Sequence, residues 1–318
     1  MKPFLPNPKK LPCYTSREMT MNEHAKLNHW QIWWLAARPK TLPAALAGVV
    51  TGTAVAMWEG RFRPVPALAA LLVGLLLQIG SNLANDVFDF ERGADTTERH
   101  GPLRVTQAGL LTPVQVKRGM WAVFGLAGAL GLYLAWVAGW PVILIGAAAI
   151  ASAIAYTGGP FPLGYYGLGD LFVFLFFGLA AVAGTYYVQA GWVSPAAWWM
   201  SVPIGLLVVD ILVVNNLRDI NTDRSAGKFT LAVRFGALGA RRQYLICVAA
   251  AYLLIPLLAW SNVIPPAALL TWLSIPLAWR VTRTVFTQSG RLLNPALAST
   301  GQLALIYSLL FLAGMLIN

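Results

Sequence analysis

Charged side chains are scarce in this sequence. Only 11% of its 318 residues are Asp, Glu, Lys or Arg, whereas soluble globular proteins average about 25%. Hydrophobic residues make up 58% of the chain, and they gather in long runs without the turn signals of a soluble domain. The composition therefore argues against a soluble fold and predicts an all-α integral membrane protein.

Other absences exclude further classes of protein. The two cysteines, Cys13 and Cys247, are too far apart in the sequence to form a metal motif or a disulfide framework. The chain has no GxxxxGK[ST] phosphate loop, so nucleotide hydrolysis is not indicated. The formal net charge of +11 is explained by membrane topology and anionic lipid headgroups, and we expect no nucleic-acid partner.

Apolar runs of about 18 residues can cross a bilayer as helices, and this sequence predicts about nine of them. We place them at 42–58, 65–84, 119–138, 141–156, 169–189, 195–216, 243–260, 263–282 and 297–317. If the chain weaves nine times, all but Arg61 and Arg63 of the 23 basic residues fall on one side. Basic loops stay in the cytoplasm, so we expect a cytoplasmic N-terminus and a C-terminus on the opposite side.

The first 27 residues are polar, basic and rich in proline, and they lack the apolar stretch of a signal peptide. We expect residues 1–27 to form a disordered basic cytoplasmic arm and residues 28–318 to form a single transmembrane domain. The segment "HWQIWWLAARPK" predicts an interfacial helix, with tryptophans anchored at the headgroups.

The second apolar run ends in a polar stripe. Helical spacing puts five side chains on one face, namely Gln78, Asn82, Asn85, Asp86 and Asp89. Gly93 can end the helix in a left-handed cap, and Asp95 follows in the loop. The apolar helix thus becomes acidic as it leaves the membrane.

The sixth apolar run ends in the same way. In "DILVVNNLRDINTDRSAGKFT", Asn215, Asp219 and Asp223 lie at i, i+4 and i+8 of one helix, Asn216 joins them, and Gly227 is the predicted stop. Two distant segments therefore end, on the same predicted side of the membrane, in amides, then carboxylates, then a glycine.

Carboxylates at i and i+4 repel each other, and charge beside hydrocarbon is costly and usually functional. A divalent cation between the two ends would relieve the repulsion, and an all-oxygen donor set suits Mg²⁺. The predicted ligands are Asn85, Asp86, Asp89, Asp95, Asp219 and Asp223. Arg104 and Lys228 each follow an acidic cluster and could reach phosphate oxygens, although solvated loop ends and simple topology charges are the structural alternatives.

These motifs resemble those of a known family. "NDVFDFERGAD" with "GPLRVTQAG" and "NNLRDINTDRSAGKFTLAVRFG" resemble the two Asp-rich motifs of the UbiA superfamily of intramembrane prenyltransferases. "RPKTLPAALAG" and "AYTGGPFPLGYYGLGDLFVFLFFGLAAVAGTYY" are similar to its 1,4-dihydroxy-2-naphthoate polyprenyltransferase (MenA) branch. The chain departs from the hydroxybenzoate and haem branches, because "YTGGPFPLGYY" lacks their Tyr-Pro-x-x-Lys-Arg-like block.

The resemblance implies nine helices around a central cavity that opens to the bilayer. It also implies Mg²⁺-dependent transfer of a polyprenyl group from an allylic diphosphate to 1,4-dihydroxy-2-naphthoate, with loss of CO₂ and diphosphate, as a step of menaquinone biosynthesis. We expect Asp86, Asp89, Asp219 and Asp223 to be catalytic. The predicted substrate contacts are Arg38, Lys40, Gln78, Asn82, Arg104, Tyr156, Asn215, Asn216, Arg218 and Lys228.

Several alternatives stay open. Tyr156, Tyr165 and Phe177 could stabilise an allylic cation or only pack. Asp170, Asp210 and His100 could lie near the site or serve packing and capping. Another aromatic acceptor or a phytyl donor is the alternative within the enzyme class. An ion-coupled transporter is the alternative from another class, but its ion sites would lie near the midplane. No obligatory protein partner is indicated.

Overall fold

The computed structural model describes residues 27–93, 101 and 103–317. The predictions for the N-terminal arm, Asp95 and His100 lie outside these residues. Within them the chain is helical and contains no strand, in agreement with the predicted all-α fold.

Helical segments, both long and short, make up the described part of the chain. They are α2 (His29–Ala37), η1 (Pro39–Thr41), α3 (Leu42–Trp58), α4 (Pro64–Glu91), α5 (Pro113–Ala138), α6 (Pro141–Ala155), η2 (Leu163–Tyr166), α7 (Gly169–Val173), η3 (Phe174–Ala180), α8 (Ala181–Ala190), α9 (Pro195–Arg218), α10 (Ile220–Ser225), α11 (Leu231–Trp260), η4 (Pro266–Ser274), α12 (Ile275–Thr287), η5 (Gly290–Leu293) and α13 (Asn294–Ile317). The segment η3 is a π-helix that joins α7 and α8 into one rod.

Local sequence explains where the helices begin. Proline occupies the first position of α4, α5, α6 and α9, where its missing N–H costs no helical hydrogen bond. Thr112 and Gln115 form a reciprocal capping box at the start of α5, and Thr230 caps α11 through Val233 N. Capping therefore starts α5 and α11 six and twelve residues before the apolar runs that predicted them.

Seven helices in the described part of the chain are long and apolar enough to cross a membrane. Two of the nine predicted spans do not meet that standard. The helix α6 is apolar but has only 15 residues, and α12 carries the exposed Arg280 and Arg283. The multi-pass helical fold is confirmed, whereas the number nine is not.

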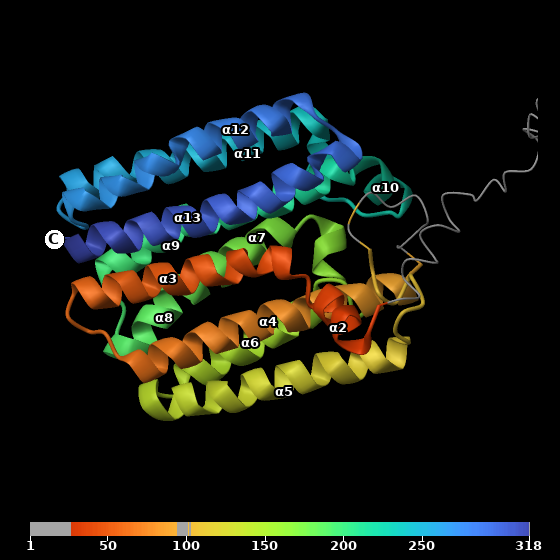
Figure 1. Cartoon of the computed structure of the whole chain (residues 1–318), viewed down its shortest axis with the longest axis horizontal. Helices are drawn as coiled ribbons and strands as arrows, with labels where there is room; N and C mark the ends of the chain where they lie inside the picture. The colour runs from red at the N-terminus through yellow and green to blue at the C-terminus, as the bar shows by residue number, and fades with distance from the viewer. Residues whose placement is uncertain (1–26, 94–100, 102, 318) are drawn as a thin grey trace, which may run out of the picture.

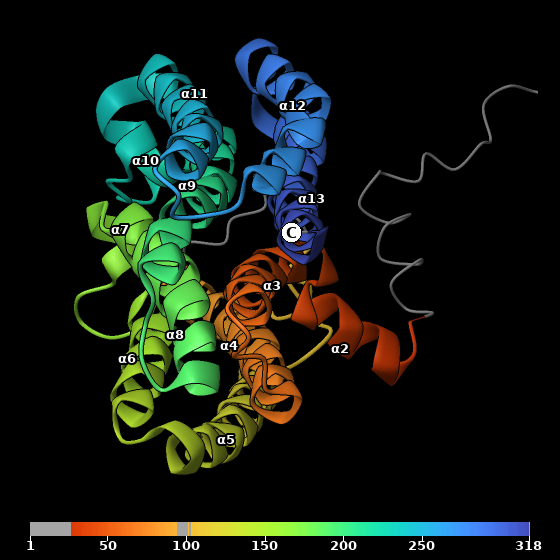
Figure 2. The ribbon, with the colours of Figure 1, turned by 90° about the vertical axis from the view of Figure 1, so that its left-hand side faces the viewer.

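The helices lie side by side, and both polar helix ends lie at one end of the bundle (Figure 1). The C-terminal end of α4, the short α10 and the interfacial candidate α2 gather there, while α13 ends at the opposite extremity. Viewed along the bundle, α11 and α12 lie on one side and α5 and α6 on the other, with α3 and α8 between them (Figure 2).

Small residues let the central helices approach closely. A Cβ on Gly178 of η3 would lie 2.7 Å from Gly205 Cα of α9, which is closer than packed atoms allow. Glycine at such a crossing lets two backbones meet. The main apolar core surrounds this contact and joins α3, α8, α9, α11 and α13.

Candidate active site

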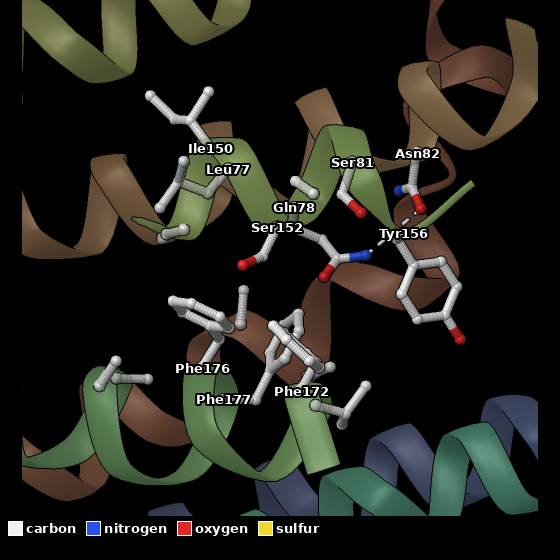
Figure 3. Close-up of a pocket in the computed structure, with 18 of the residues that line it drawn as sticks. Leu77, Gln78, Ser81, Asn82, Ile150, Ser152, Tyr156, Phe172, Phe176 and Phe177 are labelled. Carbon is white, nitrogen blue, oxygen red and sulfur yellow. Dashed lines mark hydrogen bonds between the residues drawn. The ribbon is translucent and has the colours of Figure 1, made fainter. Parts of the chain in front are cut away.

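A cavity of about 720 Å³ lies between α3, α4, α5, α6, the α7–η3–α8 rod and α9. Most of its wall is apolar, and part of that wall is shown in Figure 3. Its charged lining residues and three of its asparagines come from the ends of α4 and α9, from α10 and from the loops beside them. They are Arg38, Asn85, Asp89, Arg104, Asn215, Asn216, Asp219, Asp223 and Lys228. The two predicted acidic ends therefore meet in one cavity.

Asp89 is the centre of the first acidic end. Arg104 Nη2 lies 2.6 Å from Asp89 Oδ2, and Lys228 Nζ lies 3.4 Å from Asp89 Oδ1. The phenol of Tyr165 donates to Asp89 Oδ1 at 2.9 Å. One carboxylate thus gathers a cation from each motif and a phenol from the loop between α6 and α7.

Asp86 has a different environment from the one predicted. Its carboxylate is 1% exposed and accepts hydrogen bonds from Val105 N at 3.2 Å and Thr106 N at 3.0 Å. It is also 3.6 Å from Arg38 Nη2, and it is not among the residues that line the cavity. At about 100° per residue, Asp86 is turned about 80° from Gln78 around α4, so it lies at the edge of the stripe.

The second acidic end is arranged around a buried guanidinium. Arg218 is 2% exposed, and its Nη2 lies 2.5 Å from Asp219 Oδ2. It also donates to Asn215 Oδ1 at 2.7 Å and to Asn294 Oδ1 of α13 at 3.0 Å. Arg218, predicted to contact substrate, does not line the cavity; it holds Asp219 and ties α9 to α13.

The α9 helix ends at Arg218 and does not continue to Gly227 as predicted. Asp219 has φ −98° and ψ 12° and separates α9 from α10. This break brings Asp223 into the cavity lining. Burial, together with the negative charges of Asp219 and Asp89, raises the pKa of Asp223 to about 7, although Lys228 opposes the shift.

The loop between α6 and α7 supplies residues that the sequence patterns did not assign to the diphosphate end. Lys228 Nζ lies 4.6 Å from the ring centroid of Tyr165, and Thr157 Oγ1 donates to Asn85 Oδ1 at 3.0 Å. Phe229 N donates to Tyr165 O at 2.7 Å, so this loop is fastened to the second motif. In the sequence this loop is recognisable only as a stretch rich in glycine and tyrosine. Its contacts could not be predicted, because the residues that it meets are far away in the sequence.

The remaining candidates divide between cavity and structure. Gln78, Asn82, Tyr156 and Phe177 line the cavity, whereas Lys40 is exposed in η1, just before α3, and does not. Asp170 accepts a hydrogen bond from Gln243 Nε2 at 2.8 Å, and Asp210 is fully buried in α9 away from the cavity lining.

The donor chemistry of the cavity fits a magnesium–diphosphate group. Across the described ranges, no three His, Cys, Asp or Glu side chains converge as a preformed metal cluster. Mg²⁺ does not require one, because it is commonly held by one or two carboxylates, waters and substrate phosphates. Asn85, Asp89, Asp219 and Asp223 are oxygen donors that line the same cavity, and a cation among them would offset the mutual repulsion of the three carboxylates.

Sequence comparison gives a consistent result. The pattern of the UbiA prenyltransferase family matches residues 42–292. The 1,4-dihydroxy-2-naphthoate octaprenyltransferase of Escherichia coli (strain K12) is 40% identical over 303 residues, covering 92% of this chain and 97% of the relative. The enzyme of the same name from Mycobacterium tuberculosis (strain ATCC 25618 / H37Rv) is 42% identical over 280 residues, covering 87% and 94%.

Solved structures agree on the fold. The apo structure of a UbiA homologue from Aeropyrum pernix K1 superposes with a TM-score of 0.68 at 18% identity, covering 88% of this chain and 98% of that one. A UbiA homologue from Archaeoglobus fulgidus, bound to DMAPP and Mg²⁺, gives a TM-score of 0.65 at 14% identity, covering 90% and 99%. The chain therefore belongs to the UbiA prenyltransferase family.

Proposed function

We propose that this protein transfers a polyprenyl group from an allylic polyprenyl diphosphate to 1,4-dihydroxy-2-naphthoate, with release of CO₂ and diphosphate, to form demethylmenaquinol, the reduced form of demethylmenaquinone, in menaquinone biosynthesis. One observation carries the proposal. The acidic ends of α4 and α9, with Arg104 and Lys228, line the polar end of a cavity whose remaining wall is mostly apolar. That combination suits a substrate with a negatively charged diphosphate head and a long hydrocarbon tail, and relatives that are matched over 94–97% of their own length carry this activity in their names.

The head of the donor would occupy the polar end. Asn85, Asp89, Asp219 and Asp223 would hold Mg²⁺, which when bound neutralises charge that develops on the leaving diphosphate. Arg104 and Lys228 pair with Asp89. They lie close enough to the same space to donate to diphosphate oxygens when substrate enters.

The middle of the cavity suits ionisation of the allylic C–O bond. Tyr156, Phe172, Phe176 and Phe177 contribute aromatic side chains to its wall, and aromatic faces stabilise nearby cations. The same walls exclude water, which would otherwise hydrolyse the allylic donor. The electron-rich naphthoate ring supplies the attacking carbon, and the prenyl tail stays among apolar helices.

We also propose that the protein is an inner-membrane enzyme with the polar end of its cavity on the cytoplasmic side. The basic residues that follow the acidic motifs support this orientation under the positive-inside rule. The end of α13 would then lie on the opposite side, since it lies at the other extremity of the bundle (Figure 1).

Reconstitution tests the proposed reaction. Purified full-length protein is incubated without oxygen with 1,4-dihydroxy-2-naphthoate, Mg²⁺ and allylic diphosphates of several chain lengths, phytyl diphosphate included. Mass spectrometry should detect a prenylated product that has lost CO₂, and EDTA should abolish its formation. Product from 4-hydroxybenzoate but none from the naphthoate would refute the proposed acceptor. Movement of an ion across sealed vesicles without chemical change would favour a transporter.

A further inference from the structure

Gln78 presents a buried hydrogen-bond acceptor that nothing in the described protein satisfies. It lies in the middle of α4, lines the cavity and is 9% exposed. Its Oε1 has no hydrogen-bond partner among the described residues. Buried polar atoms are nearly always paired in native proteins, so an orphan inside a binding cavity calls for a ligand that pairs with it.

The direction of the Gln78 amide is fixed by its neighbours. The carbonyl of Ala37 can only accept, so the Asn82 group that contacts it at 2.9 Å is the Nδ2 donor. Asn82 therefore turns its Oδ1 toward Gln78, whose Nε2 donates to it at 3.3 Å. Gln78 Nε2 also donates to Thr41 Oγ1 at 3.1 Å.

Thr41 completes the chain of donors. Its hydroxyl donates to Arg38 O at 2.9 Å, so its oxygen is left to accept from Gln78 and from Asn82 Nδ2. If the Gln78 amide were reversed, its Oε1 would face Asn82 Oδ1, and two acceptor oxygens would meet without a hydrogen between them. The network therefore aims Gln78 Oε1 into the cavity, as Figure 3 shows.

We propose that Gln78 Oε1 accepts a hydrogen bond from a phenolic hydroxyl of the aromatic acceptor. This inference rests on the proposed function and assigns a position to its second substrate. Of the two substrates, only the dihydroxynaphthoate carries hydroxyl donors, because the prenyl tail has no polar hydrogen and the ionised diphosphate is an acceptor. A hydrocarbon tail against Gln78 would leave its oxygen unpaired, so this wall selects the polar ring over the tail.

The position of Gln78 fits a ring below the diphosphate. With a rise of 1.5 Å per residue, Gln78 lies about 10 Å from the level of Asn85 and about 16 Å from the level of Asp89 along α4. Ser81 and Ser152 face the same space, and the rings of Phe172, Phe176 and Phe177 stand opposite (Figure 3). A flat aromatic ring can pack against those rings while its edge meets Gln78.

The test measures equilibrium binding, which needs no turnover. Quenching of tryptophan fluorescence in the full-length protein, without oxygen and without allylic diphosphate, gives Kd for 1,4-dihydroxy-2-naphthoate and for its two monohydroxy analogues, 1-hydroxy-2-naphthoate and 4-hydroxy-2-naphthoate. Wild-type protein should bind one analogue about 10-fold more weakly than the diol, which corresponds to about 1.4 kcal/mol. Gln78→Met should weaken binding of the diol about 10-fold and leave binding of that analogue nearly unchanged.

Gln189→Met is the matched control. Gln189 is another buried glutamine, 3% exposed, which donates to Thr185 O and does not line the cavity. The Gln189→Met variant should bind all three ligands with the affinity of the wild type. If Gln78→Met does not fold, Gln78→Asn, which withdraws the oxygen by one methylene, is measured in the same way.

Three results would overturn the assignment. They are equal affinity of the wild type for all three ligands, equal weakening of all three in the Gln78 variant, and no weakening in that variant. Turnover of the wild type is followed in parallel. Absence of product from the naphthoate would refute the proposed function, whereas product with any of these three binding results would refute only the role of Gln78.

Discussion

Asp86 and Asp89 are three residues apart, yet the structure predicts that their loss has different consequences. Asp86 is buried and accepts from Val105 N and Thr106 N. Those two residues are 0% and 4% exposed. Asp86→Ala would leave both backbone N–H groups buried without an acceptor.

The expected cost follows from those two bonds. Each buried unsatisfied donor costs about 1–3 kcal/mol, so the substitution should destabilise the protein by about 2–6 kcal/mol. Native proteins have a total stability of about 5–15 kcal/mol, so this loss is a large fraction of it. Since Arg104 directly precedes Val105, release of the loop would also weaken the ion pair between Arg104 and Asp89.

Unfolding and local protection report this effect. The thermal midpoint in detergent should fall in Asp86→Ala and fall less in Asp86→Asn, whose amide oxygen can still accept one bond. Hydrogen exchange over residues 103–111 should rise in both variants. Asp223→Ala is the comparison, since it should leave that segment protected while weakening Mg²⁺-dependent binding of an allylic diphosphate.

The opposite pattern would refute the reasoning. If Asp86→Ala keeps its thermal midpoint and its protection over residues 103–111 but loses Mg²⁺-dependent diphosphate binding, then Asp86 is a metal ligand and does not anchor the loop. The original expectation from the sequence would then be correct.

Three further predictions concern Asp89, Tyr165 and Gly178. Asp89→Asn should lower kcat by at least about 100-fold, as removal of a key electrostatic group does, and should also lower the thermal midpoint, because it leaves the buried Arg104 without its carboxylate partner; a kcat within 3-fold of wild type would exclude Asp89 from the site. Tyr165→Phe removes one hydrogen bond to the Asp89 carboxylate and should lower kcat/KM for the allylic diphosphate about 10-fold without changing acceptor binding; an effect on the acceptor alone would contradict it. Gly178→Val would place a Cβ 2.7 Å from Gly205 Cα and should cost at least about 1–3 kcal/mol; an unchanged thermal midpoint would show that the helices can separate there.

Apolar runs predicted the helices because hydrocarbon length and composition are local properties of the sequence. They did not predict the helix starts at Pro113 and Leu231, because capping side chains, and not hydropathy, decide where a helix begins. The break at Asp219 was missed for a related reason. A pattern of helical spacing gives no sign of a break at a single residue, whereas the backbone at Asp219 leaves the helical conformation.

The site was predictable as far as single helices determine it. Spacing placed Asn85 and Asp89 on the face that lines the cavity, but it could not separate them from Asp86, which lies at the edge of the same stripe. Tyr165 could not be assigned to Asp89, 76 residues away in sequence, because that contact depends on how the loop after α6 packs. The unpaired Oε1 of Gln78 could not be predicted from the sequence either, because it depends on the hydrogen bonds that the neighbouring side chains form in the folded protein.

The π-helical turn Phe174–Ala180 closes its hydrogen bonds one residue later than an α-helix does. It is equivalent to a single residue inserted into an otherwise regular rod. Removing one residue from this turn would restore continuous α-helical bonding. The wider turn absorbs the extra residue, so Phe172 and Thr185 would still face the same cavity, while the path of the turn itself, which carries Phe176 and Phe177, would change. A shortened rod should therefore alter the aromatic wall of the cavity without turning the flanking helices, and a loss of activity would identify the extra residue as one retained for the shape of that wall.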